Sequence, residues 1–303
     1  MGRPVLLSAG TLTKRLRQIA YLALHPISHM RCAAVVRRSR LADDPLIPLR
    51  YLGDHLALSL RPRQRLAALA GHYAELPTML RPTARRQLRK GVVVWRRNVD
   101  GAPPLSIILE PSRLAPMEGE LQLRFRFRSD LHVLTFLIAP GAVFGMNRTR
   151  VLFVGGVQGW IGSRSEMREA SRLNDEMTPA TMLVLAVQAI AKIIAVDALV
   201  GIGEKDHISM GYSPGKVLFD YRRFWTEVGG VPCGAHYSIP LESPQKPLSE
   251  IPITHRRRAR IRREAKRLAR EEIELRLRQI LRPSVEPPQR QTERRLVMAT
   301  AGI

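Results

Sequence analysis

The chain has 303 residues, of which 45% are hydrophobic, so it can build a real core in one large domain or two small ones. Its 49 Lys+Arg residues against 26 Asp+Glu residues give a net charge of +23, which predicts attraction to polyanions such as nucleic acid, anionic lipid or lipopolysaccharide. The two cysteines, Cys32 and Cys233, fit neither a CxxC motif nor a zinc-binding spacing, and they indicate a reducing, cytoplasmic setting.

Residues 1–90 are predicted to form a basic helical N-terminal region. Leu12, Leu16 and Ile19 recur at helical spacing, and cations between them break the apolar run that a signal peptide needs. An amphipathic helix packed on the domain is one interpretation of this pattern, and a helix lying on an anionic membrane surface is the other. Several prolines divide the remainder into short helices, of which 81–90 is again basic.

From residue 91 the pattern changes to β structure. The stretch 121–128 alternates strictly, which places Leu121, Leu123, Phe125 and Phe127 toward a core. A turn at Ser129-Asp130 and an apolar run to 138 complete a predicted hairpin. The residues on the other face of the first strand include three cations in a row, which we interpret either as a solvated face or as an anion-binding stripe. They are Arg124, Arg126 and Arg128.

The stretch 151–225 predicts an α/β crossover. An apolar β-type run at 151–154 leads into a cluster of glycines, and Thr178-Pro179 has the hydroxyl N-cap and first-turn proline of a helix start. The helix 180–196 is apolar almost all round and is expected to be buried. A membrane-spanning helix is the less favoured interpretation, because Lys192 and Asp197 interrupt the apolar run. A second buried strand follows at 198–202.

The rest of the chain is predicted to complete an α/β core domain over 91–254. A short aromatic helix at 221–227 ends at Gly229-Gly230, and 236–240 is a last strand. A basic helix follows at 255–281, which we expect to be separable from the fold, and the tail 282–303 is expected to be disordered. The expected class is therefore α+β, with a mixed, mostly antiparallel sheet, a strand–Gly loop–helix–strand crossover and flanking N- and C-terminal helices.

Short signatures occur in an order typical of one family. They are FVGGVQG at 153–159, Thr178-Pro179, the strand before His207, DYRRFW at 220–225, YSIP at 237–240 and PLSEIP at 247–252. Over about residues 100–280 they resemble the VirK/YbjX family of Gram-negative bacteria. The resemblance implies a role in virulence, envelope maintenance and resistance to cationic antimicrobial peptides, without an assigned reaction. At 208–212 the chain departs from the family's basic, aromatic stretch, so no role of that loop is carried over.

One functional hypothesis is a GNAT-like acyltransferase, because a β hairpin followed by the crossover is similar to that fold. In it, backbone N–H groups at a helix N-terminus hold the pyrophosphate of acyl-CoA. The cofactor-binding candidates are Gln158, Gly159, Gly162, Ser163 and Arg164. His207 with Glu204 follows a buried strand, where a general base could sit, and Asp206 could orient it. The alternative interpretation of the glycines is a simple turn, and that of Glu204, Asp206 and His207 is a polar cap at the end of the strand.

A non-enzymatic accessory protein is the second hypothesis. It would bind an anionic lipid or a lipopolysaccharide-type polyanion, with peripheral contact to the inner membrane. Its candidate residues are Arg124, Arg126, Arg128, Arg256, Arg257 and Arg258. Nucleic-acid binding is the least favoured hypothesis, because aromatic residues for base stacking are only 5% of the chain. An arginine excess set by a GC-rich genome, without a polyanion, also stays open.

Overall fold

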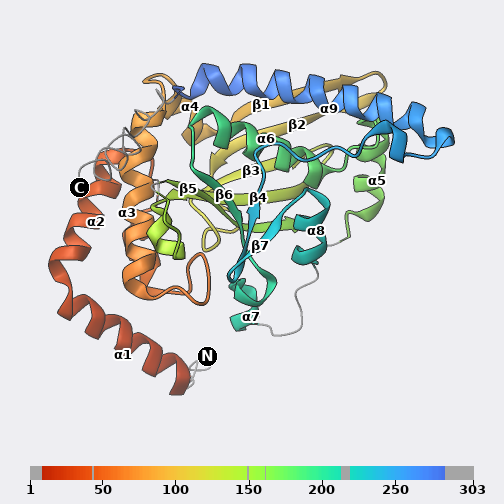
Figure 1. Cartoon of the computed structure of the whole chain (residues 1–303). Coiled ribbons are helices and arrows are strands. Elements are labelled where there is room, and N and C mark those ends of the chain that lie inside the picture. Colours follow the sequence, from red (N-terminus) through yellow and green to blue (C-terminus); the bar gives the residue numbers. More distant parts are fainter. Residues whose placement is uncertain (1–8, 43, 149, 161, 213–218, 284–303) are drawn as a thin grey trace, which may run out of the picture.

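An open eight-stranded sheet forms the centre of the molecule, with helices on both faces (Figure 1). The computed structural model describes residues 9–42, 44–148, 150–160, 162–212 and 219–283. The strand order is β1-β2-β3-β4-β5-β6-β8-β7; β5 and β6 are parallel and the other pairs antiparallel. The strands are β1 (Val92–Val99), β2 (Ala102–Pro111), β3 (Leu121–Arg126), β4 (Asp130–Ala139), β5 (Val151–Gly159), β6 (Ala198–Gly201), β7 (Val231–Cys233) and β8 (His236–Ile239). The predicted α+β class with a mixed, mostly antiparallel sheet is confirmed.

Helices from both ends of the chain cover the sheet. One face carries α6, which contacts β3 to β6, and α9, which contacts α6 and β1; α3 packs on β4 from the other face. The helices are α1 (Ala9–Leu24), α2 (Pro26–Ser39), α3 (Pro62–Met79), α4 (Ala84–Lys90), α5 (Arg164–Leu173), α6 (Pro179–Ile193), α7 (Ser209–Tyr212), α8 (Tyr221–Glu227) and α9 (Ile253–Ile280), with 3-10 turns η1 (Ile47–Leu52), η2 (Gly141–Phe144), η3 (Glu204–Asp206) and η4 (Leu248–Glu250).

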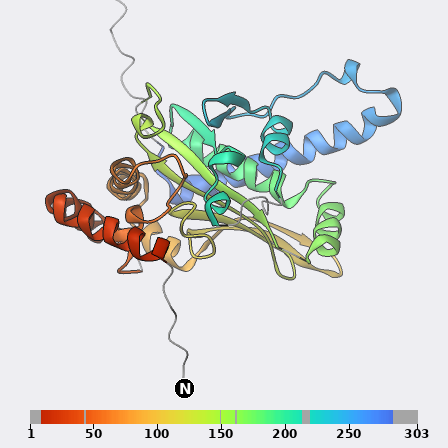
Figure 2. The ribbon, with the colours of Figure 1, turned by 90° about the horizontal axis from the view of Figure 1, so that it is seen from below.

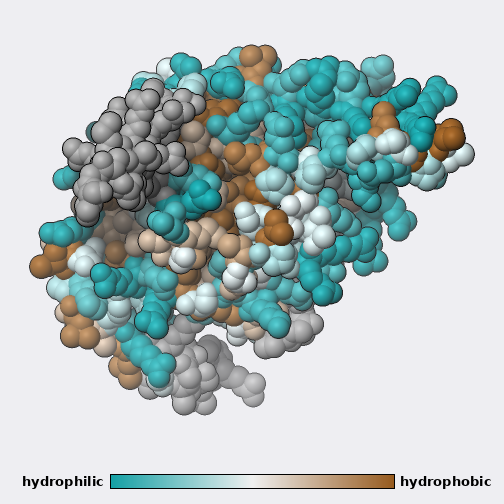
Figure 3. Space-filling view, in the orientation of Figure 1, coloured by the Kyte–Doolittle hydropathy of each residue, from teal (hydrophilic) through white to brown (hydrophobic). Residues whose placement is uncertain are grey.

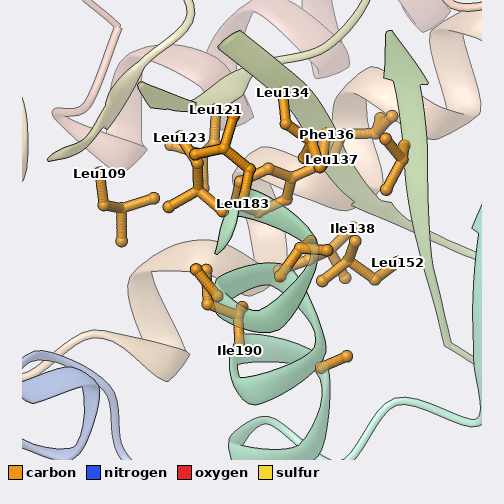
Figure 4. Packing of buried hydrophobic residues seen from close by; sticks show 14 of the residues in the cluster. Leu109, Leu121, Leu123, Leu134, Phe136, Leu137, Ile138, Leu152, Leu183 and Ile190 are labelled. Atoms are coloured by element: carbon orange, nitrogen blue, oxygen red, sulfur yellow. The ribbon is translucent and has the colours of Figure 1, made fainter. Parts of the chain in front are cut away.

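The buried helix α6 begins where the sequence predicts. The Thr178 side chain accepts a hydrogen bond from the Thr181 N–H, and Pro179 occupies the first turn, where its missing N–H costs nothing. Of its 15 residues, 12 are buried. Leu183 and Ile190 pack against side chains of β3 and β4 such as Leu123 (Figure 4). The helix ends at Ile193 rather than at 196, because Ala195 takes a left-handed backbone conformation with φ of 50°.

The glycine cluster after Val154 lies inside a strand, so the expected turn at that point is wrong. β5 continues to Gly159 and stays paired with β4, and the register shift that leaves Gly155 unpaired marks a β-bulge. A Cβ atom on Gly155 would overlap the backbone oxygen of Glu118, and one on Gly156 would overlap its carboxylate. The glycines therefore let the Glu118 loop lie directly on the sheet.

The terminal helical regions share the core of the sheet. Buried side chains of α2, α3 and α4 belong to the same hydrophobic cluster as the strands. The second half of α9 joins this cluster through Ala269, Ile273 and Leu277, so the expectation that this helix is separable from the fold is wrong. Its first half is mostly exposed. Most of the predicted disordered tail, from residue 284, lies outside the described residues.

The ends of α3 and α9 are joined directly. Leu80 and Leu281 form an antiparallel β-bridge. Arg81 N–H donates to the Ile280 carbonyl at 2.9 Å, and Arg282 N–H donates to that of Met79 at 2.7 Å. A short two-sided clamp therefore holds the N-terminal helical layer to the C-terminal helix.

Candidate functional site

The predicted arginine row on β3 is neutralised by carboxylates of the chain. Arg124 forms salt bridges with Glu110 at 2.7 Å and with Asp130 at 2.8 Å, and Asp130 also pairs with Arg126 at 2.9 Å. Arg128 lies beyond the strand and pairs with Glu169 of α5. These ion pairs explain the row without an external anion, and they fix the hairpin to α5.

The predicted catalytic residues do not form one triad. Glu204 is exposed at the start of η3. Asp206 is buried, but its carboxylate accepts hydrogen bonds from the Ser59 N–H and hydroxyl, both at 2.7 Å, and lies 3.6 Å from His236 Nε2. It therefore holds the loop before α3 and does not orient His207.

His207 is paired instead with Glu118, a residue that the sequence analysis missed. His207 Nε2 lies 3.4 Å from Glu118 Oε1, its Nδ1 lies 2.6 Å from Ser209 Oγ, and its ring stacks obliquely on Tyr221. Glu118 also accepts hydrogen bonds from Gln158 and from the Thr135 hydroxyl. In sequence Glu118 stands in a turn-like segment, EGE at 118–120, which carried no signal of a buried carboxylate.

A second buried carboxylate in the same segment, Glu120, holds the α3 side together. It accepts hydrogen bonds from His55 at 2.9 Å, Arg50 at 3.1 Å and the Tyr73 hydroxyl at 2.7 Å. Burial alone would raise the pKa of Glu120, but the hydrogen bond and charge of His55, with the charge of Arg50, lower it to about 2. The cluster is a buried ion network that ties η1 and α3 to the sheet.

The predicted acyl-CoA cradle is divided between the two faces of the sheet. Gln158 pairs with Val133 and Gly159 with His132, so Gln158 and His132 point to opposite faces. Gly162 has a φ of +88°, and Ser163 precedes α5, where its hydroxyl donates to the Trp160 carbonyl. Of the five candidates, Arg164 lines a groove beside α5.

That groove, of about 900 Å³, lies between α5 and the N-terminus of α6. Three exposed arginines line it from one face of α5, at positions i, i+4 and i+8, and they form no salt bridge with any described carboxylate. They are Arg164, Arg168 and Arg172. The acids of α5 point elsewhere: Glu166 accepts from the Ser129 N–H and hydroxyl, and Glu169 pairs with Arg128. The helix therefore places its arginines in the groove and uses its carboxylates to bind the hairpin.

A second groove of about 540 Å³ adjoins the first and is lined by the exposed half of α9. At the N-terminus of α6, Thr178 lines the first groove and Thr181 lines the second. Glu176 lines both grooves and forms a salt bridge with Arg258 at 3.1 Å. The cations of the second groove are Lys246, Arg258, Arg262, Arg263 and Lys266. Burial, Arg270 and Arg262 lower the pKa of Lys266, which is the effect of cations without enough counter-charge. We call the two together the basic groove.

Of the remaining predicted arginines, two lie outside the lining of the basic groove. Arg256 donates to the carbonyls of Ile251 and Ser249 and so closes the start of α9. Arg257 is exposed. The helical spacing turns these side chains away from Arg258, so the predicted trio does not act as one patch.

A buried histidine forms part of the groove wall. His132 is 8% exposed and lines the α5 side beside Arg164 and Arg168. Neither ring nitrogen has a hydrogen-bond partner of normal geometry among the described residues, although the backbone of Leu131 favours the protonated ring. Burial lowers the pKa of His132 to about 4, so the ring is neutral at pH 7.

Comparison with known proteins gives a family but no reaction. A family model described as "Protein of unknown function (DUF535)" matches residues 11–269. The chain is similar to the "Uncharacterized protein YbjX" of Escherichia coli (strain K12), with 27% identity over 235 residues that cover 74% of this chain and 69% of that protein. No solved structure matches.

Proposed function

The chain belongs to the DUF535 family, as its resemblance to VirK/YbjX proteins predicts, and we propose that it binds a phosphate-bearing anionic component of the bacterial envelope in the basic groove. The observation that carries the proposal is the set of arginines on α5 that form no salt bridge with a carboxylate in the described part of the chain. Arginine forks suit phosphate oxygens, which they bind through two parallel hydrogen bonds.

Two further features of the groove support an anionic ligand. The helix dipole at the N-terminus of α6 favours negative charge between the two rows of cations. Lys266 and its neighbours repel one another in the absence of an anion, so a bound phosphate relieves an unfavourable interaction. The described lining contains no Phe, Trp or Tyr side chain, which disfavours single-stranded nucleic acid.

Titration with pyrophosphate, lipopolysaccharide and an oligonucleotide, each followed by calorimetry, tests the proposal. Arg168→Gln should weaken pyrophosphate and lipopolysaccharide binding more than tenfold, since a charge-assisted hydrogen bond contributes about 1.5–3 kcal/mol. The salt dependence should fall with it. Arg86→Gln on α4 is the matched control, because Arg86 is also an exposed helical arginine but lies outside the groove. Equal binding by both variants would refute the proposal. Tighter binding of the oligonucleotide than of lipopolysaccharide would show that the ligand is a nucleic acid and not an envelope component.

A GNAT-like acyltransferase is the second candidate, and the parallel β5–α5–α6–β6 crossover favours it. The paired ladder of β5 and β6 ends at Val154 and Gly201, while β5 runs on to Gly159. Side chains of α8 occupy the gap: the Tyr221 hydroxyl lies 3.1 Å from the Val157 nitrogen and accepts its N–H, and the Trp225 indole donates to the Ile202 carbonyl. An acyl-CoA in this gap would have to displace Tyr221. Saturable CoA binding that improves in Tyr221→Ala would support the enzyme, and binding of pyrophosphate without CoA would exclude it.

A further inference from the structure

The N-terminal helix α1 exposes the side of itself that is apolar. Leu16 and Ile19 are 58% and 62% exposed, and the exposed Ala20 and Ala23 continue the same stripe at i+4 and i+7 of Leu16. The side that faces the protein carries the half-buried Gln18, Tyr21 and Leu22. Gln18 donates to the Leu52 carbonyl, and the Tyr21 ring meets that of Tyr51 edge to face. A surface helix of a water-soluble domain normally has the opposite orientation.

The apolar surface continues onto α2. Leu24, Ile27 and Met30 are 75%, 64% and 67% exposed, on both sides of the bend between the helices. The two helices meet at 92°. In the described chain no single helix is long and apolar enough to cross a membrane, whereas this bent pair together has the length and composition to do so. Figures 1 and 2 show α1 projecting from the body, at the end of the molecule opposite α5. In Figure 3, hydrophobic residues (brown) and hydrophilic residues (teal) alternate along the lower left edge of the molecule, where α1 and α2 lie in Figure 1.

The positive charge around this apolar surface indicates which kind of partner it binds. Residues 1–42 contain no Asp or Glu, whereas seven cations lie between Lys14 and Arg40. Arg15 and Arg17 flank the apolar stripe on α1 and are exposed, as is Arg31 on α2. A second copy of the chain would bring two acid-free faces together, and their like charges would repel. An anionic lipid surface satisfies both the apolar stripe and the cations.

We propose that α1 and the first turns of α2 bind the surface of an anionic bilayer, with the apolar stripe in the interface and the arginines among the headgroups. The stripe comprises Leu16, Ile19, Leu24, Ile27 and Met30. This surface is separate from the basic groove and does not depend on it. We place α1 in the plane of the membrane, because this helix alone is too short to span it and meets α2 at 92°.

Sedimentation of the full chain with vesicles tests this inference. Vesicles of phosphatidylglycerol and phosphatidylcholine should bind it, and vesicles of phosphatidylcholine alone should bind it at least tenfold more weakly. The double variant Leu16→Gln/Ile19→Gln should lose binding to the anionic vesicles by at least about tenfold, since two large side chains leave the interface. Arg17→Gln should weaken it about fivefold, which corresponds to about 1 kcal/mol for one cation near such a surface.

Leu275→Gln is the matched control, because Leu275 is 62% exposed on α9, away from the stripe. Its vesicle binding should equal that of the unmodified chain. Unchanged binding of the double variant, or equal binding to neutral vesicles, would overturn the inference. So would a dimer in analytical ultracentrifugation that the double variant dissociates, because the stripe would then join two copies.

Discussion

Acidification should lower the free energy of unfolding of the protein, and the buried His132 should contribute to this loss. The folded pKa of His132 is about 4, against an ordinary value of 6.5. Because the folded pKa is the lower one, its stabilisation is complete above pH 6.5 and is lost as the pH falls toward 4. For these two values, linkage gives a loss of about 2 kcal/mol between pH 7 and pH 5.

Urea unfolding of the chain and of His132→Phe at pH 7 and pH 5 measures this loss. His72 on α3 has the same burial-driven shift, with a pKa of about 4, and contributes a similar amount. These two histidines together should therefore cost the unmodified chain about 4 kcal/mol, and His132→Phe should lose about 2 kcal/mol less than the unmodified chain. The comparison uses each protein's own difference between the two pH values, so a constant effect of the substitution cancels. An undiminished loss in His132→Phe would refute the reasoning.

Three further predictions follow from the packing and the ion pairs. Ala186→Asp in α6 should cost at least about 4 kcal/mol and prevent folding, because the helix is buried all round; a melting temperature like that of the unmodified chain would contradict the burial. Gly155→Ala should also lower the melting temperature by circular dichroism, since its Cβ would overlap the Glu118 backbone. Gly145→Ala should cost less, because its Cβ meets no atom and only its left-handed φ of 69° adds strain, of about 1 kcal/mol. Arg126→Gln should leave pyrophosphate binding unchanged in calorimetry, because Asp130 already neutralises that arginine; a loss of binding would restore the β3 row as an anion site.

The elements with strong periodicity could be predicted from the sequence. The hairpin of β3 and β4, the helix α6 with its Thr178 cap and the parallel partner β6 follow from alternation, apolar faces and capping chemistry. The length of β5 could not, because glycines in a strand look like a turn until the loop that lies on them is known.

The candidate sites were predicted less well, since they depend on long-range partners. Alternation placed Arg124 and Arg126 on one face of β3, but nothing in the local sequence names Glu110 or Asp130 as their partners. His207 was identified by its place after a strand, and its partner Glu118 lies 89 residues earlier in the chain. The arginines at 168 and 172 were overlooked because a helix with mixed charges reveals its faces only when its packing side is known.

The clamp between α3 and α9 has a consequence for synthesis on the ribosome. The two strands of the bridge, at Leu80 and Leu281, are about two hundred residues apart in sequence, and α9 is translated after every other described element. The hydrophobic side of α3 can meet the sheet earlier, but its C-terminal end stays unclamped until α9 is released. Such distant contacts slow folding. The nascent chain therefore exposes apolar surface for most of its translation, a state in which chaperones bind.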